Sequence, residues 1–163
     1  MSFHGYDHVI ERNHIHDVIQ EASDEGAIYT VRSWSQRGTV IRENYIHDVD
    51  SGQAGSGQMG IYIDDLMSGM TIVRNVIHRA DRGFMIGGGR DNDLRHNLVL
   101  DSTRAIQFDA RGVPGHWREY FCDEDSSLMR GLREDPYRED PWRSHYPSLA
   151  PIREDDPCLP KRN

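Results

Sequence analysis

The sequence predicts an all-β fold: a right-handed, single-stranded parallel β-helix of about four to five coils, followed by an irregular C-terminal tail. Three observations predict it. A ten-residue motif centred on asparagine occurs four times without gaps, and each copy is followed by a short apolar strand. Hydrophobic residues make up only 36% of the 163 residues, which suits a solenoid because each coil buries only a narrow strip of side chains. All seven prolines lie in the last third.

The motif supplies the first two sides of each coil. Its copies cover residues 9–18, 40–49, 71–80 and 93–102, with the asparagines Asn13, Asn44, Asn75 and Asn97. An apolar residue stands three positions before and two positions after each asparagine. Asparagine tolerates the left-handed conformation of a tight bend. Coils stacked about 4.8 Å apart would therefore align the amides in an Asn ladder.

A second strand completes each coil. These strands cover residues 26–30, 60–64, 83–87 and 105–109. In the last of them Ile106 and Phe108 alternate with Gln107 and Asp109, which predicts that the apolar pair points inward. A β-sandwich is the alternative for such short strands, but it gives no reason for a column of four asparagines.

Composition divides the chain into two parts. Residues 1–112 form the coil region, and residues 113–163 form an extended, Pro- and Arg-rich tail that packs on or crosses the coils. The polar insertion 50–59 is expected to border a groove, since insertions on one face of a solenoid commonly line its binding surface. Cys122 and Cys158 are too few for a disulfide framework; we expect unpaired thiols, with a pair inside the tail as the alternative.

Charge and hydropathy exclude several classes of partner. The net charge is −8 and the basic residues form no cluster, so neither nucleic acid nor an anionic membrane surface is an expected partner. No apolar run reaches the roughly 18 residues that a membrane span requires. The first residues, 1–9, show no export signal, and the localisation stays open.

Acidic residues recur where the second strands end. Our alignment places four residues at this position: Thr30, Asp64, Gly87 and Asp109. The next position holds Val31, Asp65, Gly88 and Ala110. Asp64 and Asp109 would lie two strand spacings apart, about 9.5 Å between Cα atoms. Tilted side chains would bring the carboxyl groups within the range of glycosidase acid pairs.

Several neighbours complete the predicted site. Asp65 is the next carboxylate, as a second acid or an orienting partner. Gly87 and Gly88 would form a floor on which a sugar ring can lie, bordered by Arg90 and Asp91. The alternatives are a turn residue for each aspartate, a flexible loop for the glycines and a structural ion pair for Arg90 and Asp91. Arg111 would bind a substrate hydroxyl or neutralise Asp109.

Three histidines occupy equivalent positions: His16, His47 and His78. Metal ligands have to converge on a point, whereas a column at strand spacing points its rings in parallel. We therefore predict a solvated, hydrogen-bonded column and no metal site. His47, followed by Asp48 and the polar insertion, is the member that we expect to border the groove and contact substrate.

These motifs resemble pectate-lyase-like β-helix proteins, and more closely bacterial proteins of glycoside hydrolase family 141. The residues that carry the resemblance are the repeat Asn-x-Ile-His-Asp-Val, the segments 60–65, 87–92 and 109–112, and in the tail 141–149 and 155–157. The resemblance implies an oligo- or polysaccharide substrate and a pair of catalytic carboxyls, Asp64 (or Asp65) and Asp109. Such relatives are usually exported and are longer, so the chain looks like a truncated fragment whose open ends could self-associate into a homo-oligomer.

Three functions stay open at this point. Glycoside hydrolysis needs no cofactor and uses the paired aspartates. A polysaccharide lyase would need a basic residue beside bound Ca²⁺, and because the single lysine is Lys161, Arg90 or Arg111 would have to serve. The third reading is a non-catalytic β-helix fragment with a binding or structural role.

Overall fold

The computed structural model describes residues 1–49 and 55–163; residues 50–54 of the predicted groove insertion lie outside the described part. Its strands are β1 (Val9–Glu11), β2 (His14–His16), β3 (Glu25–Val31), β4 (Val40–Arg42), β5 (Tyr45–His47), β6 (Gln58–Asp64), β7 (Thr71–Val73), β8 (Val76–His78), β9 (Arg82–Ile86), β10 (Asp93–Arg95), β11 (Leu98–Leu100) and β12 (Arg104–Phe108). Three helices follow: α1 (Arg118–Cys122), α2 (Ser127–Glu134) and α3 (Trp142–His145).

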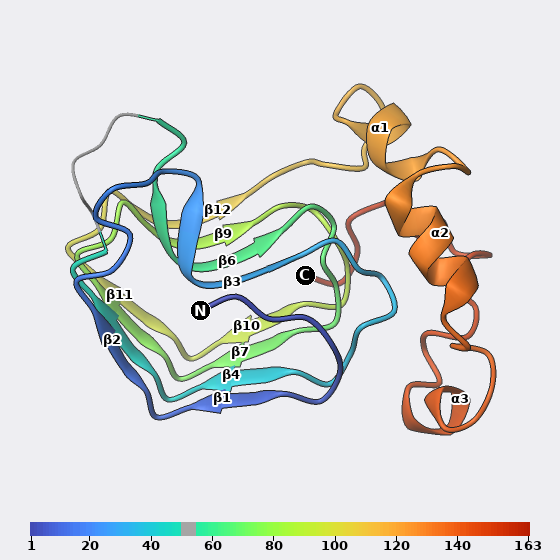
Figure 1. Cartoon of the computed structure of the whole chain (residues 1–163), viewed down its shortest axis with the longest axis horizontal. Coiled ribbons are helices and arrows are strands. Elements are labelled where there is room, and N and C mark those ends of the chain that lie inside the picture. The colour runs from blue at the N-terminus through green and yellow to red at the C-terminus, as the bar shows by residue number, and fades with distance from the viewer. Residues whose placement is uncertain (50–54) are drawn as a thin grey trace.

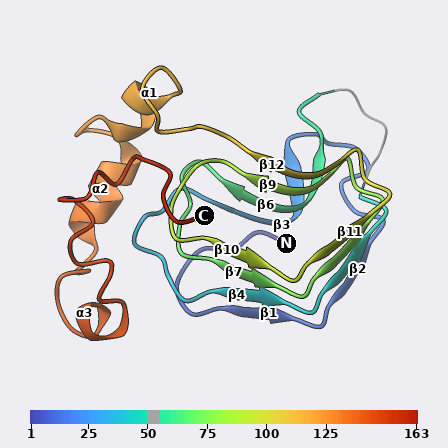
Figure 2. The same ribbon diagram turned by 180° about the vertical axis from the view of Figure 1, so that it is seen from behind.

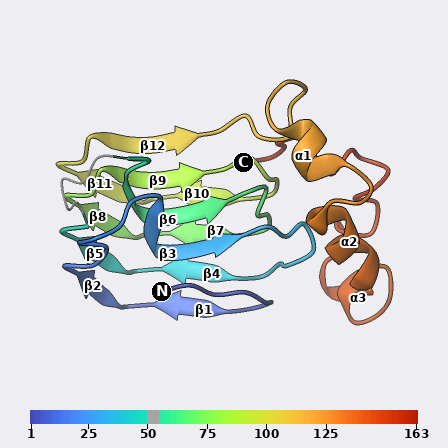
Figure 3. The ribbon, with the colours of Figure 1, turned by 45° about the horizontal axis from the view of Figure 1, so that its top comes forward.

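The strands form three parallel sheets of four strands each, in the orders β1-β4-β7-β10, β2-β5-β8-β11 and β3-β6-β9-β12. The chain visits the three sheets in the same sequence four times, so each circuit adds one strand to each sheet (Figure 1). A side view shows the third-sheet strands stacked beside one another (Figure 3). The predicted strand-rich, parallel architecture is confirmed, and no sheet closes on itself.

The asparagines stack as predicted. The side-chain amide of Asn13 donates to Oδ1 of Asn44 at 2.9 Å, Asn44 donates likewise to Asn75 at 2.9 Å, and Asn75 to Asn97 at 3.0 Å. The conformational part of the prediction is wrong. The left-handed residue is the one before each asparagine, with φ of 55–56° at Arg12, Glu43, Arg74 and His96. The asparagine side chain is used along the stack, so the preceding residue makes the corner.

The core contains inward-facing residues from all three sheets, among them Ile10 of β1, Ile46 of β5 and Ile61 of β6. Ile61 and Ile63 are fully buried, which matches the facing predicted for this strand. Where the sheets approach most closely, the register places a small residue in each circuit: Ala27, Gly60, Gly83 and Ala105. A Cβ at Gly60 would lie only 2.7 Å from the Ile77 side chain.

The predicted alignment of β3 is wrong by one residue. The structure pairs Val31 with Asp64 and Thr30 with Ile63. The error arose because Gly26 was matched with Gly60, whereas Ala27 fills that small-residue position. For the later circuits the predicted alignment is confirmed: Ile63 pairs with Ile86 and Ile86 with Phe108, so Asp64, Gly87 and Asp109 follow at one position.

The tail forms a second apolar cluster beside the sheets. Its helices lie together on one side of the strands (Figures 1 and 2). Residues of α1 and α2, such as Phe121 and Leu128, pack with Trp34 and Leu66, which come from loops between the circuits. Cys122 and Cys158 form a disulfide, so the expectation of unpaired thiols is wrong: packing of the tail on itself brings their Cα atoms to 6.0 Å.

Within residues 1–49 and 55–163, none of the helices has the length and apolar character needed to cross a membrane.

Candidate functional site

A pocket of about 450 Å³ lies between the carboxyl ends of β3 and β6 and the start of the tail. Polar and charged groups form its floor: Asp24, Arg32, Asp64, Asp65 and Arg111. Aromatic groups form much of its wall: Tyr29, Tyr62, Trp117, Tyr120 and Phe121. Parallel strands end at the same sheet edge, which is why residues from successive circuits meet here.

Arg111 connects the predicted carboxylates. One of its terminal nitrogens donates to an oxygen of Asp64 and to an oxygen of Asp65, and its Nε donates to Asp109 at 3.0 Å. The other oxygen of Asp65 accepts from Nε of Arg32 at 2.7 Å. The structure therefore brings all three predicted carboxylates around one guanidinium, although Asp109 itself does not line the pocket.

Burial sets the acidity of this cluster. The side chains of Asp64 and Asp65 are 10% and 8% exposed. Burial, together with the negative charge of Asp65, raises the pKa of Asp64 above its ordinary value, and the attraction of Arg111 only partly offsets this. Burial alone would lower the pKa of Arg111, but Asp64, Tyr62 and Asp65 outweigh it, so the pKa of Arg111 is raised.

The backbone around the two buried aspartates is strained. Asp65 and Leu66 have φ of 43° and 64°, a left-handed conformation that costs free energy for residues other than glycine. The corner is held by bonds to its neighbours: Leu66 N–H donates to the carbonyl of Gly87 at 2.8 Å, and Asp65 N–H donates to Oδ1 of Asp64 at 2.7 Å. Strained residues of this kind concentrate at functional sites.

The predicted glycine floor lies directly beside this corner. A Cβ at Gly87 would stand 2.8 Å from Oδ1 of Asp64 and 2.8 Å from the amide nitrogen of Asp65, so only glycine lets the strands approach this closely. Gly88, with φ of 78°, lies under the backbone of Arg111. Neither glycine is among the pocket-lining residues. Gly87 packs against Asp64 and Asp65, and Gly88 packs against Arg111.

The aromatic wall was missed from the sequence. Tyr29 and Tyr62 stand in register on neighbouring strands, and the hydroxyl of Tyr29 donates to Asp64 at 3.3 Å. Burial and the charge of Asp64 raise the pKa of Tyr29 and of Tyr62. Trp117 and Tyr120, 64% exposed each, come from the beginning of the tail. The signals were a tyrosine repeated on the outward face of the second strand and the aromatic run directly after the last circuit.

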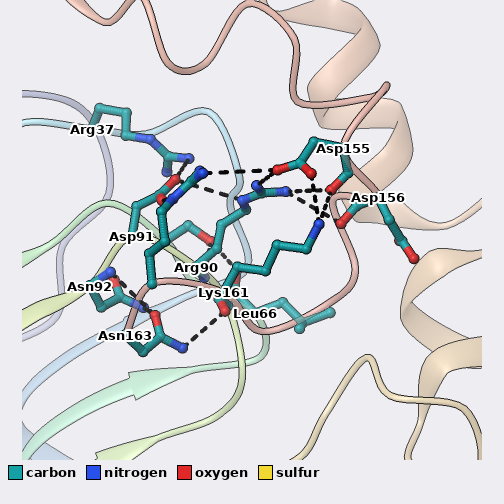
Figure 4. A network of polar contacts seen from close by, with 12 residues as sticks. Arg37, Leu66, Arg90, Asp91, Asn92, Asp155, Asp156, Lys161 and Asn163 are labelled. Carbon is teal, nitrogen blue, oxygen red and sulfur yellow. Dashed lines mark hydrogen bonds and ion pairs between the residues drawn. The ribbon is translucent and has the colours of Figure 1, made fainter.

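Arg90 and Asp91 lie elsewhere. The side chain of Arg90 is 1% exposed and contacts the Asp155 carboxylate and the carbonyl oxygens of residues 155 and 156. Asp91 accepts from Arg37 at 3.3 Å and from Arg162. Figure 4 shows this network joining the coil to the C-terminal residues. Both residues thus form ion pairs between the coil and the C-terminal residues, and neither lines the pocket.

His47 also lies away from the pocket, on the second sheet. It pairs in register with His16 and His78, as predicted for the column. Its Nδ1 is 2.6 Å from the carboxylate of Asp48. It contacts none of the pocket residues described above, so the two groups of residues form separate surfaces.

Comparisons with protein-family models, with curated proteins and with solved structures found no match to this chain.

Proposed function

We propose that this chain is a right-handed parallel β-helix that binds and hydrolyses a saccharide in the pocket formed by Asp64, Asp65 and Arg111, as a glycoside hydrolase-like protein. The repeated order of the three parallel sheets supports the coil, and connections between parallel strands are right-handed in nearly all proteins. The resemblance to bacterial β-helix glycosidases supports the same fold and the same activity.

One observation carries the functional proposal: two buried carboxyl groups face a pocket whose rim holds exposed aromatic rings. Carboxyl groups and Arg111 can bind sugar hydroxyls, while the faces of Trp117 and Tyr120 offer apolar surfaces for the C–H groups of a sugar ring. Such a combination of convergent polar groups and aromatic walls is typical of small-ligand sites.

The roles follow from the environments of the carboxyls. Asp64, whose pKa is raised by burial and by the charge of Asp65, is the group that would donate a proton to the glycosidic oxygen. Asp65, which accepts hydrogen bonds from Arg32 and Arg111, would serve as the second carboxylate, with Asp109 as the alternative on the other side of Arg111. Substrate hydroxyls would replace carboxylate oxygens as partners of Arg111.

A lyase mechanism has less support. Its base would be Arg111, but the raised pKa of this guanidinium opposes loss of a proton. The donor set also does not fit Ca²⁺, since Asp64 and Asp65 each direct an oxygen at a guanidinium nitrogen. We derive no step through that ion.

The contacts of Arg111 do favour one alternative, a non-catalytic saccharide-binding role. A guanidinium that bonds to both buried carboxylates occupies oxygens that acid–base chemistry would use, while the aromatic rim stays accessible. In that case the wild type would have no hydrolase activity for the aspartate variants described below to lower, and saccharide binding would depend on Trp117.

The test is a glycan hydrolysis screen with the wild type, Asp64→Asn, Asp109→Asn and the control Asp125→Asn, an exposed aspartate outside the pocket lining. Loss of a general acid should lower activity about 10²- to 10⁴-fold in Asp64→Asn, with the control unchanged. Equal activity in all four proteins would exclude the proposed acid. Saccharide binding that Trp117→Ala abolishes, without any product, would establish the binding role instead.

The disulfide is consistent with an exported protein, because disulfides persist in oxidising compartments. We therefore propose that the substrate is an extracellular saccharide.

A further inference from the structure

Three imidazoles gather on the outward face of the second sheet. His14 and His16 flank Ile15 on β2, and because strand side chains alternate, both point away from the core that Ile15 contacts. Parallel pairing places His47 of β5 beside His16. The ring centroids are 4.9 Å apart for His14 and His47, 5.1 Å for His16 and His47, and 4.7 Å for His14 and His16. Each ring therefore contacts the other two.

Two of the three rings have their Nδ1 atom beside a carboxylate. Nδ1 of His47 lies 2.6 Å from the carboxylate of Asp48, and Nδ1 of His16 lies 2.7 Å from that of Asp17. An imidazole that donates from Nδ1 to a carboxylate has its lone pair on Nε2, the arrangement seen around protein-bound zinc. Nε2 of His14 already lies 2.7 Å from Nε2 of His47, so two ligand atoms meet at one point.

We propose that His14, His16 and His47 bind a divalent transition metal, best Zn²⁺, through their Nε2 atoms, with Asp48 and Asp17 as the outer carboxylates. Tetrahedral zinc with Zn–N bonds of about 2.0–2.1 Å needs its ligand nitrogens roughly 3.3 Å apart. His14 and His47 have to separate by only about 0.6 Å from their present contact to reach this spacing.

Binding also requires His16 to turn. Its ring is stacked on His47 with 6° between the planes, and no set of three His, Cys, Asp or Glu side chains in the described ranges is posed around a metal position as they stand. The side chain of His16 is 47% exposed, so rotation is not blocked by packing. His47 is 16% exposed.

The surrounding charges allow a cation here. The nearest guanidinium, that of Arg79, contacts both oxygens of Asp48 and is thereby neutralised. Asp17 contributes a further negative charge. The prediction of a metal-free column considered only His16, His47 and His78. It overlooked the His-x-His pattern of residues 14–16, which adds His14 as a ligand beside the column, with its ring tilted by 37° from that of His47.

Titration calorimetry with tag-free, EDTA-treated protein and ZnCl₂ tests the proposal, together with the absorption of tetrahedral Co²⁺ in place of zinc. We expect saturable binding of one metal per chain and loss of binding in His14→Ala and His47→Ala. Asp48→Ala should weaken binding about 10- to 100-fold, as for other outer carboxylates. His78→Ala is the matched control, a column histidine that contacts Asp101 instead.

Circular dichroism checks that each histidine and aspartate variant keeps its fold. The proposal is overturned if the wild type shows no saturable binding, if His14→Ala and His47→Ala bind as tightly as the wild type, or if His78→Ala loses affinity to the same extent. Because this sheet face contains none of the pocket residues, neither outcome depends on the proposed hydrolase activity.

Discussion

At the residue scale, Arg111 controls the charge of the carboxyls around it. Its attraction holds the pKa of Asp64 down against burial and against the charge of Asp65. We predict that Arg111→Gln raises the pKa of Asp64 further, because the two causes that favour the protonated form stay in place. A carboxyl ¹³C NMR titration measures this. The control variant Arg104→Gln changes an exposed residue that is hydrogen-bonded to Gln107, and it should leave the pKa of Asp64 unchanged.

The same change has a defined effect on stability. A carboxyl whose pKa is raised on folding contributes stability below its unfolded pKa and loses that contribution as the pH rises through its folded pKa. Arg111→Gln raises the folded-state pKa of Asp64, so the pH interval over which this contribution is lost extends to higher pH. The loss of stability relative to the wild type should therefore grow from acidic to neutral pH in urea unfolding experiments. A difference that shrinks over this range would show that Arg111 does not hold the pKa of Asp64 down.

At the scale of the elements, the asparagine ladder makes a large contribution inside the stack. Oδ1 of Asn75 accepts both the side-chain amide and the backbone N–H of Asn44, and both residues are buried. Asn75→Ala leaves these two donors without that acceptor, which should cost about 2–4 kcal/mol of unfolding free energy. Asn13→Ala, at the partly exposed end, should cost clearly less. Equal losses by urea denaturation would mean that the ladder is uniform and that burial does not matter.

The small residues between the sheets make a second prediction. A Cβ at Gly83 would lie 2.5 Å from the carbonyl oxygen of Ala105 and 2.8 Å from Val99. Gly83→Ala should therefore destabilise the protein by about 1–3 kcal/mol. In α2, a Cβ at Gly131 meets nothing within 4 Å, so Gly131→Ala should stabilise by about 0.5–1 kcal/mol through helix propensity. A stable Gly83→Ala protein would show that the sheets can separate there.

These elements also show what the sequence could and could not predict. The repeat identified the parallel strands and the stacked asparagines because each circuit carries the same residue at the same place. The register of β3 failed because Ala27 occupies the position of Gly60 and Gly83, so the neighbouring Gly26 was matched with them instead. Asp64, Asp65, Asp109 and Arg111 were found from that repeat. Trp117 and Tyr120 were not, since the tail has no periodicity and its packing depends on long-range contacts such as those of Trp34.

At the scale of the whole molecule, the two ends of the stack differ. At the first circuit, residues 1–3 cover β3: Ser2 pairs with Tyr29, and the amino terminus donates to the carbonyl of Ala27 at 2.7 Å. At the last circuit, β12 ends the sheet order, and its inward-facing Ile106 and Phe108 are 43% and 54% exposed. Strand edges with exposed apolar side chains favour association with another strand.

We therefore predict that two copies of the chain associate through β12. Head-to-tail stacking would bring β12 against the edge of β3 that residues 1–3 cover, so we expect β12 to pair with β12 of a second copy, which gives a closed two-fold dimer and no fibre. Sedimentation velocity should show a concentration-dependent dimer that the double variant Ile106→Lys, Phe108→Lys abolishes. Trp117→Lys, which changes a still more exposed apolar residue at the pocket, should dimerise normally. A wild type that stays monomeric at high concentration would mean that exposed apolar residues at this edge do not suffice, whereas growing assemblies would show that residues 1–3 release β3.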